Sequence, residues 1–165
     1  MAKLYIISGF PFAGKSTIAR TLVDKFKLVR VALDDINVEL NRDKEELSED
    51  DWQVTYDIYS DRISKNLRAG NSVITDTVAH TKEARDGLRR LAQANNAVAQ
   101  VIFVATPLET VKQRLQKNRK TLERVDVEDA IFDEITRNFE VPTEDEHAIW
   151  VKPDTRLGDI YKHFA

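Results

Sequence analysis

The stretch Gly9-Phe10-Pro11-Phe12-Ala13-Gly14-Lys15-Ser16 matches the pattern G-x-x-x-x-G-K-[ST] at every specified position. The short apolar run Leu4–Ser8 precedes it, and Thr17–Phe26 follows with apolar residues at helical spacing. A strand, a glycine-containing turn and a helix in this order surround an anion with backbone N–H groups. In such a turn the lysine reaches the β- and γ-phosphates of a nucleotide, and the next hydroxyl binds Mg²⁺. Residues Gly9 to Thr17 therefore predict a binding site for a nucleoside triphosphate and Mg²⁺.

Strand-like and helical segments alternate along the rest of the chain. Short apolar runs predict four further strands, at Leu28–Leu33, Ser72–Asp76, Ala97–Ala105 and Ala148–Val151. Apolar residues at helical spacing predict helices at Trp52–Ala69, Thr81–Asn95, Leu108–Asn118, Val127–Phe139 and Leu157–Phe164. This alternation predicts an α/β fold, a three-layer α/β/α sandwich around a five-stranded, mostly parallel sheet. At this length we expect one domain over residues 1–165.

Composition excludes several classes of protein. The 165 residues contain no cysteine, which excludes disulfides, thiolate metal sites and a cysteine nucleophile, and fits a reducing cytoplasm. Lys+Arg 25 against Asp+Glu 28 argues against a surface coated in basic charge for duplex nucleic acid. No window approaches the ~18 consecutive apolar residues of a membrane span. The apolar run before Gly9 is also too short for a signal peptide.

Aspartates follow two of the predicted strands. Asp34 and Asp35 come directly after Leu28–Leu33, and Asp76 ends the next strand. Because ligands of an open parallel sheet bind outside the carboxyl ends of its strands, we expect all three on the side of the phosphate loop. Asp76 is expected to bind Mg²⁺, directly or through water, and Asp34 to accept a proton from an attacking hydroxyl. A helix N-cap is the alternative for such aspartates, and we favour it for Asp35.

A basic stretch, Lys112–Arg124, lies between two predicted helices. Arg114 and Arg119 are five residues apart, so they diverge on a regular helix and converge only if the helix breaks between them, with Asn118 as the expected break. Arginine forks are suited to the charge of a transferred phosphoryl group, and a mobile lid can bring them in. We therefore expect a basic lid over residues 112–124, with Arg114 and Arg119 as catalytic residues. A solvated helix end is the alternative.

Together these motifs resemble the small P-loop kinases, the group that includes the kinase domain of phage-type polynucleotide kinase, the zeta-toxin family and chloramphenicol phosphotransferase. The resemblance covers nearly the whole chain. It rests on four segments in the order of that group, namely Gly9–Ser16, Val31-Ala32-Leu33-Asp34-Asp35, Val73-Ile74-Thr75-Asp76-Thr77 and Arg114–Arg119. Thr81–Arg85 is similar to a polynucleotide kinase segment, and Phe139–Thr143 to one that these kinases carry before their last strand.

The resemblance implies a nucleotide-kinase-like fold, ATP as the phosphoryl donor and Mg²⁺ as cofactor. It implies that Asp34 activates the acceptor hydroxyl, and that Lys152 and Pro153 hold the adenine edge. Two positions depart from the pattern. Asn37 stands where polynucleotide kinases carry an arginine that touches nucleic acid, which argues against a polynucleotide acceptor. Phe12-Ala13 stands where Gly-Ser is frequent, and the bulk of Phe12 narrows the acceptor side of the expected pocket.

The helical segment 41–69 is the expected acceptor side. Trp52, Tyr56 and Tyr59 form a stripe on one helix face, for which core packing is the usual reason and a stacking platform the alternative. An acidic run there suits a cationic or neutral acceptor rather than a polyanion; it comprises Glu45, Glu46, Glu49, Asp50 and Asp51. The candidate acceptor contacts are Asp35, Asn37, Trp52, Tyr56, Thr77 and His80. For His80 a surface histidine is an equally good interpretation.

Three functions fit these residues. The first is a Mg²⁺-dependent kinase that moves the γ-phosphate of ATP to a hydroxyl, on a small molecule or nucleotide-like acceptor. The second is a polynucleotide 5′-hydroxyl kinase; nucleic acid is thus a possible but not a favoured partner, and a membrane is not expected as one. The third is an ATP-binding switch or ATPase without a separate acceptor. Asp34 discriminates among them, because a kinase needs it whereas a switch does not.

Overall fold

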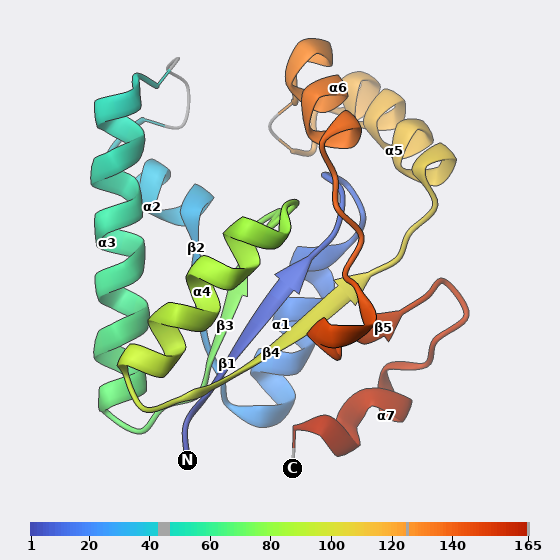
Figure 1. Cartoon of the computed structure of the whole chain (residues 1–165). Coiled ribbons are helices and arrows are strands. Elements are labelled where there is room, and N and C mark those ends of the chain that lie inside the picture. The colour runs from blue at the N-terminus through green and yellow to red at the C-terminus, as the bar shows by residue number, and fades with distance from the viewer. Residues whose placement is uncertain (43–46, 125, 165) are drawn as a thin grey trace.

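A five-stranded sheet, with every strand parallel to its neighbours, forms the centre of the structure, a computed structural model that describes residues 1–42, 47–124 and 126–164 (Figure 1). The strand order is β2-β3-β1-β4-β5. The strands are β1 (Lys3–Ser8), β2 (Val29–Ala32), β3 (Val73–Asp76), β4 (Val98–Val104) and β5 (Ile149–Val151). The central position of β1 places the loop that follows it, the phosphate loop, at the middle of the sheet edge. The expected α/β sandwich with a parallel sheet is confirmed.

Helices cover both faces of the sheet. They are α1 (Lys15–Phe26), α2 (Leu33–Glu39), α3 (Glu49–Arg68), α4 (Lys82–Ala94), α5 (Leu108–Thr121), α6 (Asp129–Arg137) and α7 (Leu157–Ile160), with short 3-10 turns η1 (Glu144–Glu146) and η2 (Tyr161–His163). Figure 1 shows α4 in front of the sheet and α1 behind it, with α5 and α6 beyond the carboxyl ends of the strands. No helix of the described ranges is both long enough and apolar enough to cross a membrane.

Alternate residues of β1 supply the two halves of the core. Leu4 and Ile6 pack with side chains of α2, α3 and α4, whereas Tyr5 and Ile7 pack with those of α1, α5, α6 and α7. All four are almost fully buried. This alternation follows from the strand geometry, in which successive side chains point to opposite faces of the sheet. A strand that is apolar on both faces is typical of a sheet with helices on both sides.

The end of β2 differs from the prediction. The strand ends at Ala32, and Leu33 begins a helix, α2, that the sequence analysis missed. Leu33, Ile36 and Leu40 pack together in the core, and acidic residues are favourable in a first helical turn, where Asp34 and Asp35 lie. The N-cap is the backbone of Ala32 with no side-chain bond, so the N-cap interpretation of Asp35 was wrong.

The expected helix break at Asn118 was also wrong, because α5 continues to Thr121. The Asn118 side chain bonds the backbone of Arg124 twice, at 2.9 Å to its carbonyl and 2.9 Å from its N–H, so it orders the segment after the helix. At the start of α3 the Ser48–Asp51 capping box is present. The acidic residues Glu45 and Glu46 lie outside the described residues.

Candidate active site

The phosphate loop joins β1 to α1 and depends on its two glycines. A Cβ on Gly9 would lie 2.9 Å from the Val104 carbonyl oxygen, so the loop can leave the sheet here only with glycine. Gly14 has φ 99°, a left-handed conformation that suits glycine, and it forms the N-cap of α1. The N–H of Ala13 donates to the Phe10 carbonyl at 3.1 Å, which closes the turn. The two glycines and this hydrogen bond therefore set the course of the chain between β1 and α1.

Lys15 is buried in this loop, and its ammonium donates to the Phe10 carbonyl at 2.6 Å. Burial lowers the pKa of Lys15 from 10.5 to about 8, although the carboxylates of Asp76 and Asp34 act to raise it. A buried ammonium whose hydrogen bond goes to a carbonyl is poorly solvated, and a polyphosphate would add negative charge beside it. Lys15 is thus poised for an anion.

Ser16 and Asp76 form the candidate magnesium site. The Ser16 hydroxyl donates to Asp76 Oδ1 at 3.2 Å, which places an alcohol and a carboxylate oxygen side by side. Oxygen ligands of this kind are those that Mg²⁺ prefers, with phosphates and waters completing its shell. Within the described residues there is no group of three or more His, Asp or Glu side chains that could hold a metal.

Arg30 is the site residue that the sequence analysis missed. From β2 its guanidinium contacts Asp76 Oδ2, with Nε at 2.9 Å and Nη2 at 2.7 Å, and it pairs with Asp35 at 2.5 Å. It therefore holds one oxygen of Asp76 and leaves the other facing Ser16. The available signal was a charged residue inside an otherwise apolar run that predicts a buried strand.

Asp34 lies in the first turn of α2, and its side chain is exposed to solvent. No hydrogen bond or ion pair joins its carboxylate to another residue of the described part of the chain. Desolvation raises the pKa of Asp34, and the charges of Asp76 and Asp35 raise it further, whereas Lys15 and Arg30 oppose the change. Asp34 is thus an accessible carboxylate whose pKa is raised and which lies within the electrostatic influence of Lys15 in the phosphate loop.

A cavity of about 480 Å³ adjoins the other side of the phosphate loop. Arg114 lines it and donates to the Phe12 carbonyl at 3.0 Å. Its wall includes Ala13, Gly14, Thr17, Lys117, Arg124, Lys152 and Pro153. The structure therefore brings the predicted adenine-side residues to the phosphate loop. Arg124, which had no individual role in the sequence analysis, joins them.

Arg119 is not among the residues that line this cavity. It pairs instead with Asp126 at 3.1 Å and with Asp129 at 2.8 Å, in the segment that leads into α6. The uninterrupted α5 explains this, since residues five apart on a regular helix point in different directions. The structure thus places Arg114 at the site and does not place Arg119 there.

The acceptor-side candidates divide into two groups. Tyr59 is 3 % exposed and belongs to the core, whereas Trp52 and Tyr56 are 37 % and 48 % exposed, with ring centroids 5.9 Å apart. Core packing therefore accounts for Tyr59 alone. Asn37 is buried and accepts a hydrogen bond from Thr55 Oγ1 at 2.7 Å, which gives it a structural contact.

Thr77 and His80 are partly buried in the loop after β3. The backbone of that loop meets the phosphate loop, because the Gly9 N–H donates to the Val78 carbonyl at 3.3 Å. The His80 carbonyl accepts from the Glu140 N–H at 2.8 Å. Both candidate side chains thus lie in the connection that starts at Asp76.

A parallel sheet with a glycine-framed phosphate loop after its central strand defines a P-loop nucleotide-binding fold. The sequence profile of the AAA_33 family, described as an AAA domain, matches residues 4–142, and the chain belongs to this family. The resemblance to the group of small P-loop kinases, which the sequence motifs indicated, is thereby confirmed. No curated protein sequence matches the chain.

Solved structures share the fold, among them one described as a putative kinase and one described as an APS kinase. Kti12 from Chaetomium thermophilum, in complex with ADP-AlF3, has a TM-score of 0.76 at 17% identity, over 98% of this chain and 99% of that one. A putative kinase from Chloroflexus aurantiacus has a TM-score of 0.75 at 15% identity, over 98% and 93%. The APS kinase CysC of Mycobacterium tuberculosis, with AMPPNP and APS, has a TM-score of 0.66 at 18% identity, over 98% and 94%. At these identities the likeness concerns the fold.

Proposed function

We propose that the chain is an ATP- and Mg²⁺-dependent kinase that transfers the γ-phosphate of ATP to the hydroxyl of an acceptor, a small molecule or nucleotide-like compound. The observation that carries the proposal is the carboxylate of Asp34, which is accessible, has a raised pKa and lies within the electrostatic influence of Lys15 and Asp76. A nucleotide-binding switch has no need for a base in this position.

In the proposed reaction the acceptor hydroxyl attacks the γ-phosphorus, and Asp34 takes the proton of that hydroxyl. A bond forms between the acceptor oxygen and phosphorus, the bond from phosphorus to the oxygen shared with the β-phosphate breaks, and ADP leaves. The pKa of Asp34 is raised by desolvation and by the charges of Asp76 and Asp35, so its carboxylate is a stronger base than an ordinary aspartate. The proton and the phosphoryl group thus both have a defined destination.

Positive charge from this chain opposes the charge of the phosphates. Lys15 lies in the phosphate loop, and Arg114 reaches over it from α5 to the Phe12 carbonyl. These side chains bind and orient the polyphosphate, and arginine suits phosphate oxygens through its forked donors. Ser16 and Asp76 would hold Mg²⁺, which when bound neutralises phosphate charge.

The charges around Asp34 favour a neutral or cationic acceptor. Asp34, Asp35 and Asp76 are close enough to influence one another, and Arg30 pairs with the latter two. A phosphorylated acceptor or a polynucleotide would bring further negative charge to these carboxylates, while the donors of Arg30 are engaged there. The exposed aromatic rings of Trp52 and Tyr56 offer an apolar surface on α3.

The test is transfer of labelled γ-phosphate to a panel of acceptors, with Mg²⁺, for the wild type and Asp34→Asn. The panel holds aminoglycosides, neutral metabolites, nucleosides, sugar nucleotides and 5′-hydroxyl oligonucleotides. Asp24→Asn, which changes an exposed carboxylate on α1, is the matched control. We expect Asp34→Asn to lose about 10²–10⁴-fold in turnover, the usual scale for a general base, and to keep its nucleotide affinity.

Each outcome has a defined meaning. Transfer that disappears in Asp34→Asn and persists in Asp24→Asn supports the kinase and identifies the acceptor class. Transfer confined to oligonucleotides would replace the small acceptor by a polynucleotide 5′-hydroxyl. Phosphate release to water alone, unchanged in Asp34→Asn, would favour a switch or ATPase and remove Asp34 from the chemistry.

A further inference from the structure

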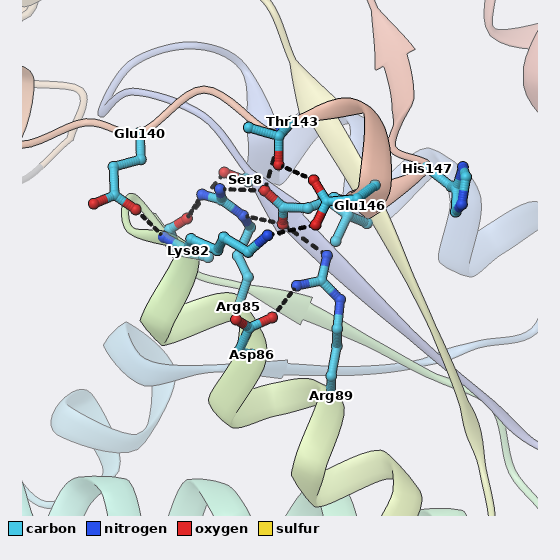
Figure 2. Close-up of polar contacts among 12 residues, drawn as sticks. Ser8, Lys82, Arg85, Asp86, Arg89, Glu140, Thr143, Glu146 and His147 are labelled. Carbon is cyan, nitrogen blue, oxygen red and sulfur yellow. Dashed lines mark hydrogen bonds and ion pairs between the residues drawn. The ribbon is translucent and has the colours of Figure 1, made fainter.

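Arg85 of α4 and Glu146 of η1 form an ion pair inside the protein (Figure 2). Their side chains are 0 % and 1 % exposed. The guanidinium forms a fork on the carboxylate, with Nε to Oε2 at 2.8 Å and Nη2 to Oε1 at 2.7 Å. Arg89, one helical turn further along α4, donates to the same carboxylate at 2.7 Å. Two arginines of α4 thus donate hydrogen bonds to a single buried glutamate.

Arg85 also holds the loop that follows β3. Its Nη1 donates to the Ala79 carbonyl at 3.1 Å, and the Ser8 hydroxyl, from the residue before the phosphate loop, donates to the same oxygen at 3.0 Å. Ala79 has φ 42°, a left-handed conformation that disfavours a residue with a Cβ. Strained residues of this kind persist only where the surroundings impose them. Among the described residues, the side chains of Arg85 and Ser8 hold the Ala79 carbonyl.

The residues 77–81, which we call the β3–α4 loop, connect the candidate metal ligand Asp76 to α4. This loop touches the phosphate loop directly, because the Gly9 N–H donates to the Val78 carbonyl at 3.3 Å. A shift of the β3–α4 loop would therefore move Asp76, which precedes the loop. It would also move Gly9, the first residue of the phosphate loop, which is bonded to Val78. Asp76 belongs to the candidate magnesium site and Gly9 to the phosphate loop, and both must contact the same nucleotide.

Glu146 belongs to the segment 138–148, which leads from α6 to β5 and packs over the same loop. The Glu140 N–H donates to the His80 carbonyl at 2.8 Å, and the Glu140 carboxylate accepts from the Lys82 N–H at 2.6 Å. Phe139 packs on Phe10 of the phosphate loop, with ring centroids 4.5 Å apart. Figure 2 shows Glu140 above the start of α4 and Glu146 above Arg85 and Arg89.

A buried ion pair is a poor way to gain stability alone, because desolvation of the two charges offsets much of their attraction. Burial acts to raise the pKa of Glu146, but the hydrogen bonds from Arg85 and Arg89 outweigh it and bring the pKa down to about 2. The glutamate is therefore ionised, and its full charge fixes the direction of both guanidinium groups. Apolar side chains of similar volume could fill this space, but they could not hold a carbonyl in place.

We propose that Arg85 and Glu146 are positioning residues for phosphoryl transfer, which hold the β3–α4 loop so that Asp76 and the phosphate loop keep their mutual geometry. The inference rests on the proposed function. It extends the site to residues that touch neither nucleotide nor acceptor and that act through Ala79, Val78 and Gly9.

The experiment compares Glu146→Gln and Arg85→Lys with two controls. Arg89→Gln removes a contact to Glu146 but leaves the fork and the Ala79 bond intact. Asn95→Ala removes hydrogen bonds to Ser64 and Arg68 at the other end of α4, about 15 Å from Arg85 along the helix. The unfolding temperature of each variant is measured first, and activity is then assayed below the lowest of these temperatures.

Two readouts are needed. The first is amide hydrogen exchange at Gly9, Lys82 and Glu140, whose N–H groups bond the β3–α4 loop and the segment 138–148. The second is kcat and KM for ATP in γ-phosphate transfer. We expect faster exchange at all three amides and a fall in kcat of about 10–100-fold in both main variants, with a smaller change in KM, since a displacement of ~1 Å has this effect on a catalytic constellation. The controls should keep kcat within about twofold even where they melt lower.

A loss of kcat in Asn95→Ala equal to that in Glu146→Gln would show that stability alone is responsible and would overturn the proposal. Unchanged kcat in Glu146→Gln and Arg85→Lys, with or without faster exchange, would do the same. Lys15→Ala separates this result from the proposed function. If Lys15→Ala transfers phosphate at the wild-type rate, or if the wild type transfers none, the kinase assignment itself is wrong.

Discussion

Binding of a nucleoside triphosphate should be accompanied by uptake of a proton at alkaline pH. Burial lowers the pKa of Lys15 from 10.5 to about 8 in the nucleotide-free protein. This drop corresponds to about 3 kcal/mol of lost stabilisation of the ammonium form. Phosphate oxygens beside Lys15 restore that stabilisation, so its pKa rises when the nucleotide binds, and a lysine that was neutral becomes charged.

The size of the uptake follows from these values. With a free-protein pKa near 8 and a bound pKa near 10.5, binding takes up about 0.1 proton at pH 7, about 0.5 at pH 8 and about 0.9 at pH 9. Titration calorimetry with Mg²⁺ and a non-hydrolysable ATP analogue measures this directly, when it is repeated in buffers of different ionisation enthalpy. At pH 9 the phosphates of the nucleotide are fully ionised, so Lys15 dominates the signal.

Lys15→Arg is the control, because its guanidinium stays protonated throughout this pH range and binding should then take up no proton. Uptake that does not rise between pH 7 and pH 9, or that is the same in Lys15→Arg, would refute the reasoning. Either result would mean that Lys15 is already fully charged before the nucleotide arrives, and that the phosphate loop solvates it better than its burial indicates.

Two further predictions concern the general base and the turn of the phosphate loop. Activity that depends on ionised Asp34 is lost as the pH falls through the pKa of Asp34, which sets the acid limb of a kcat–pH profile. Asp35→Asn removes a charge that raises this pKa, so the acid limb should move to lower pH. Arg30→Gln removes a charge that lowers this pKa, so the acid limb should move to higher pH. Shifts in one common direction would contradict the assignment of that limb to Asp34. Gly9→Ala should lower stability by about 1–3 kcal/mol in thermal or urea unfolding, because its Cβ would lie 2.9 Å from a carbonyl oxygen of β4, whereas Gly158→Ala, which meets nothing within 4 Å, should not destabilise. Equal stability of the two variants would show that the turn at the end of β1 can relax.

The predictable part of the molecule is the part in which one residue pattern has one structural meaning. Strands such as Leu4–Ser8 are apolar on both faces, and only a doubly covered parallel sheet buries both. The glycines of the phosphate loop are constrained by backbone geometry that no other residue satisfies as well, so the motif locates Lys15, Ser16 and the helix after them. Lys152 and Pro153 were expected there only from the resemblance to small P-loop kinases, and the structure places both in the wall of the cavity beside the loop.

The errors arose where two structures share one pattern. Leu33, Ile36 and Leu40 are spaced for a helix, but Leu33 also continues the apolar run of the strand before it, so it was assigned to that strand and the helix α2 was missed. Asn118 is a residue type common at helix ends, yet here its side chain bonds Arg124 beyond the helix, and α5 continues. The core contacts of α2 come from other elements of the fold, and those of Asn118 come from the segment just after α5.

Arg30 and Arg85 show why charged side chains are harder to place than apolar ones. An arginine in a strand or a helix pattern is normally assigned to solvent, and its local sequence does not identify the partner that it meets in the fold. Arg30 meets Asp76 from a neighbouring strand 46 residues away, and Arg85 meets Glu146 across 61 residues. Burial of a charged side chain is costly unless an opposite charge pairs with it, so its position depends on a partner elsewhere in the fold. The sequence does give a hint, because Arg85, Leu88 and Ala92 share one face of α4, and a long side chain on an apolar face requires an opposite charge elsewhere in the chain. Such a residue is a better candidate for a positioning role than for stability, and this expectation is the one that the Glu146→Gln and Asn95→Ala comparison tests.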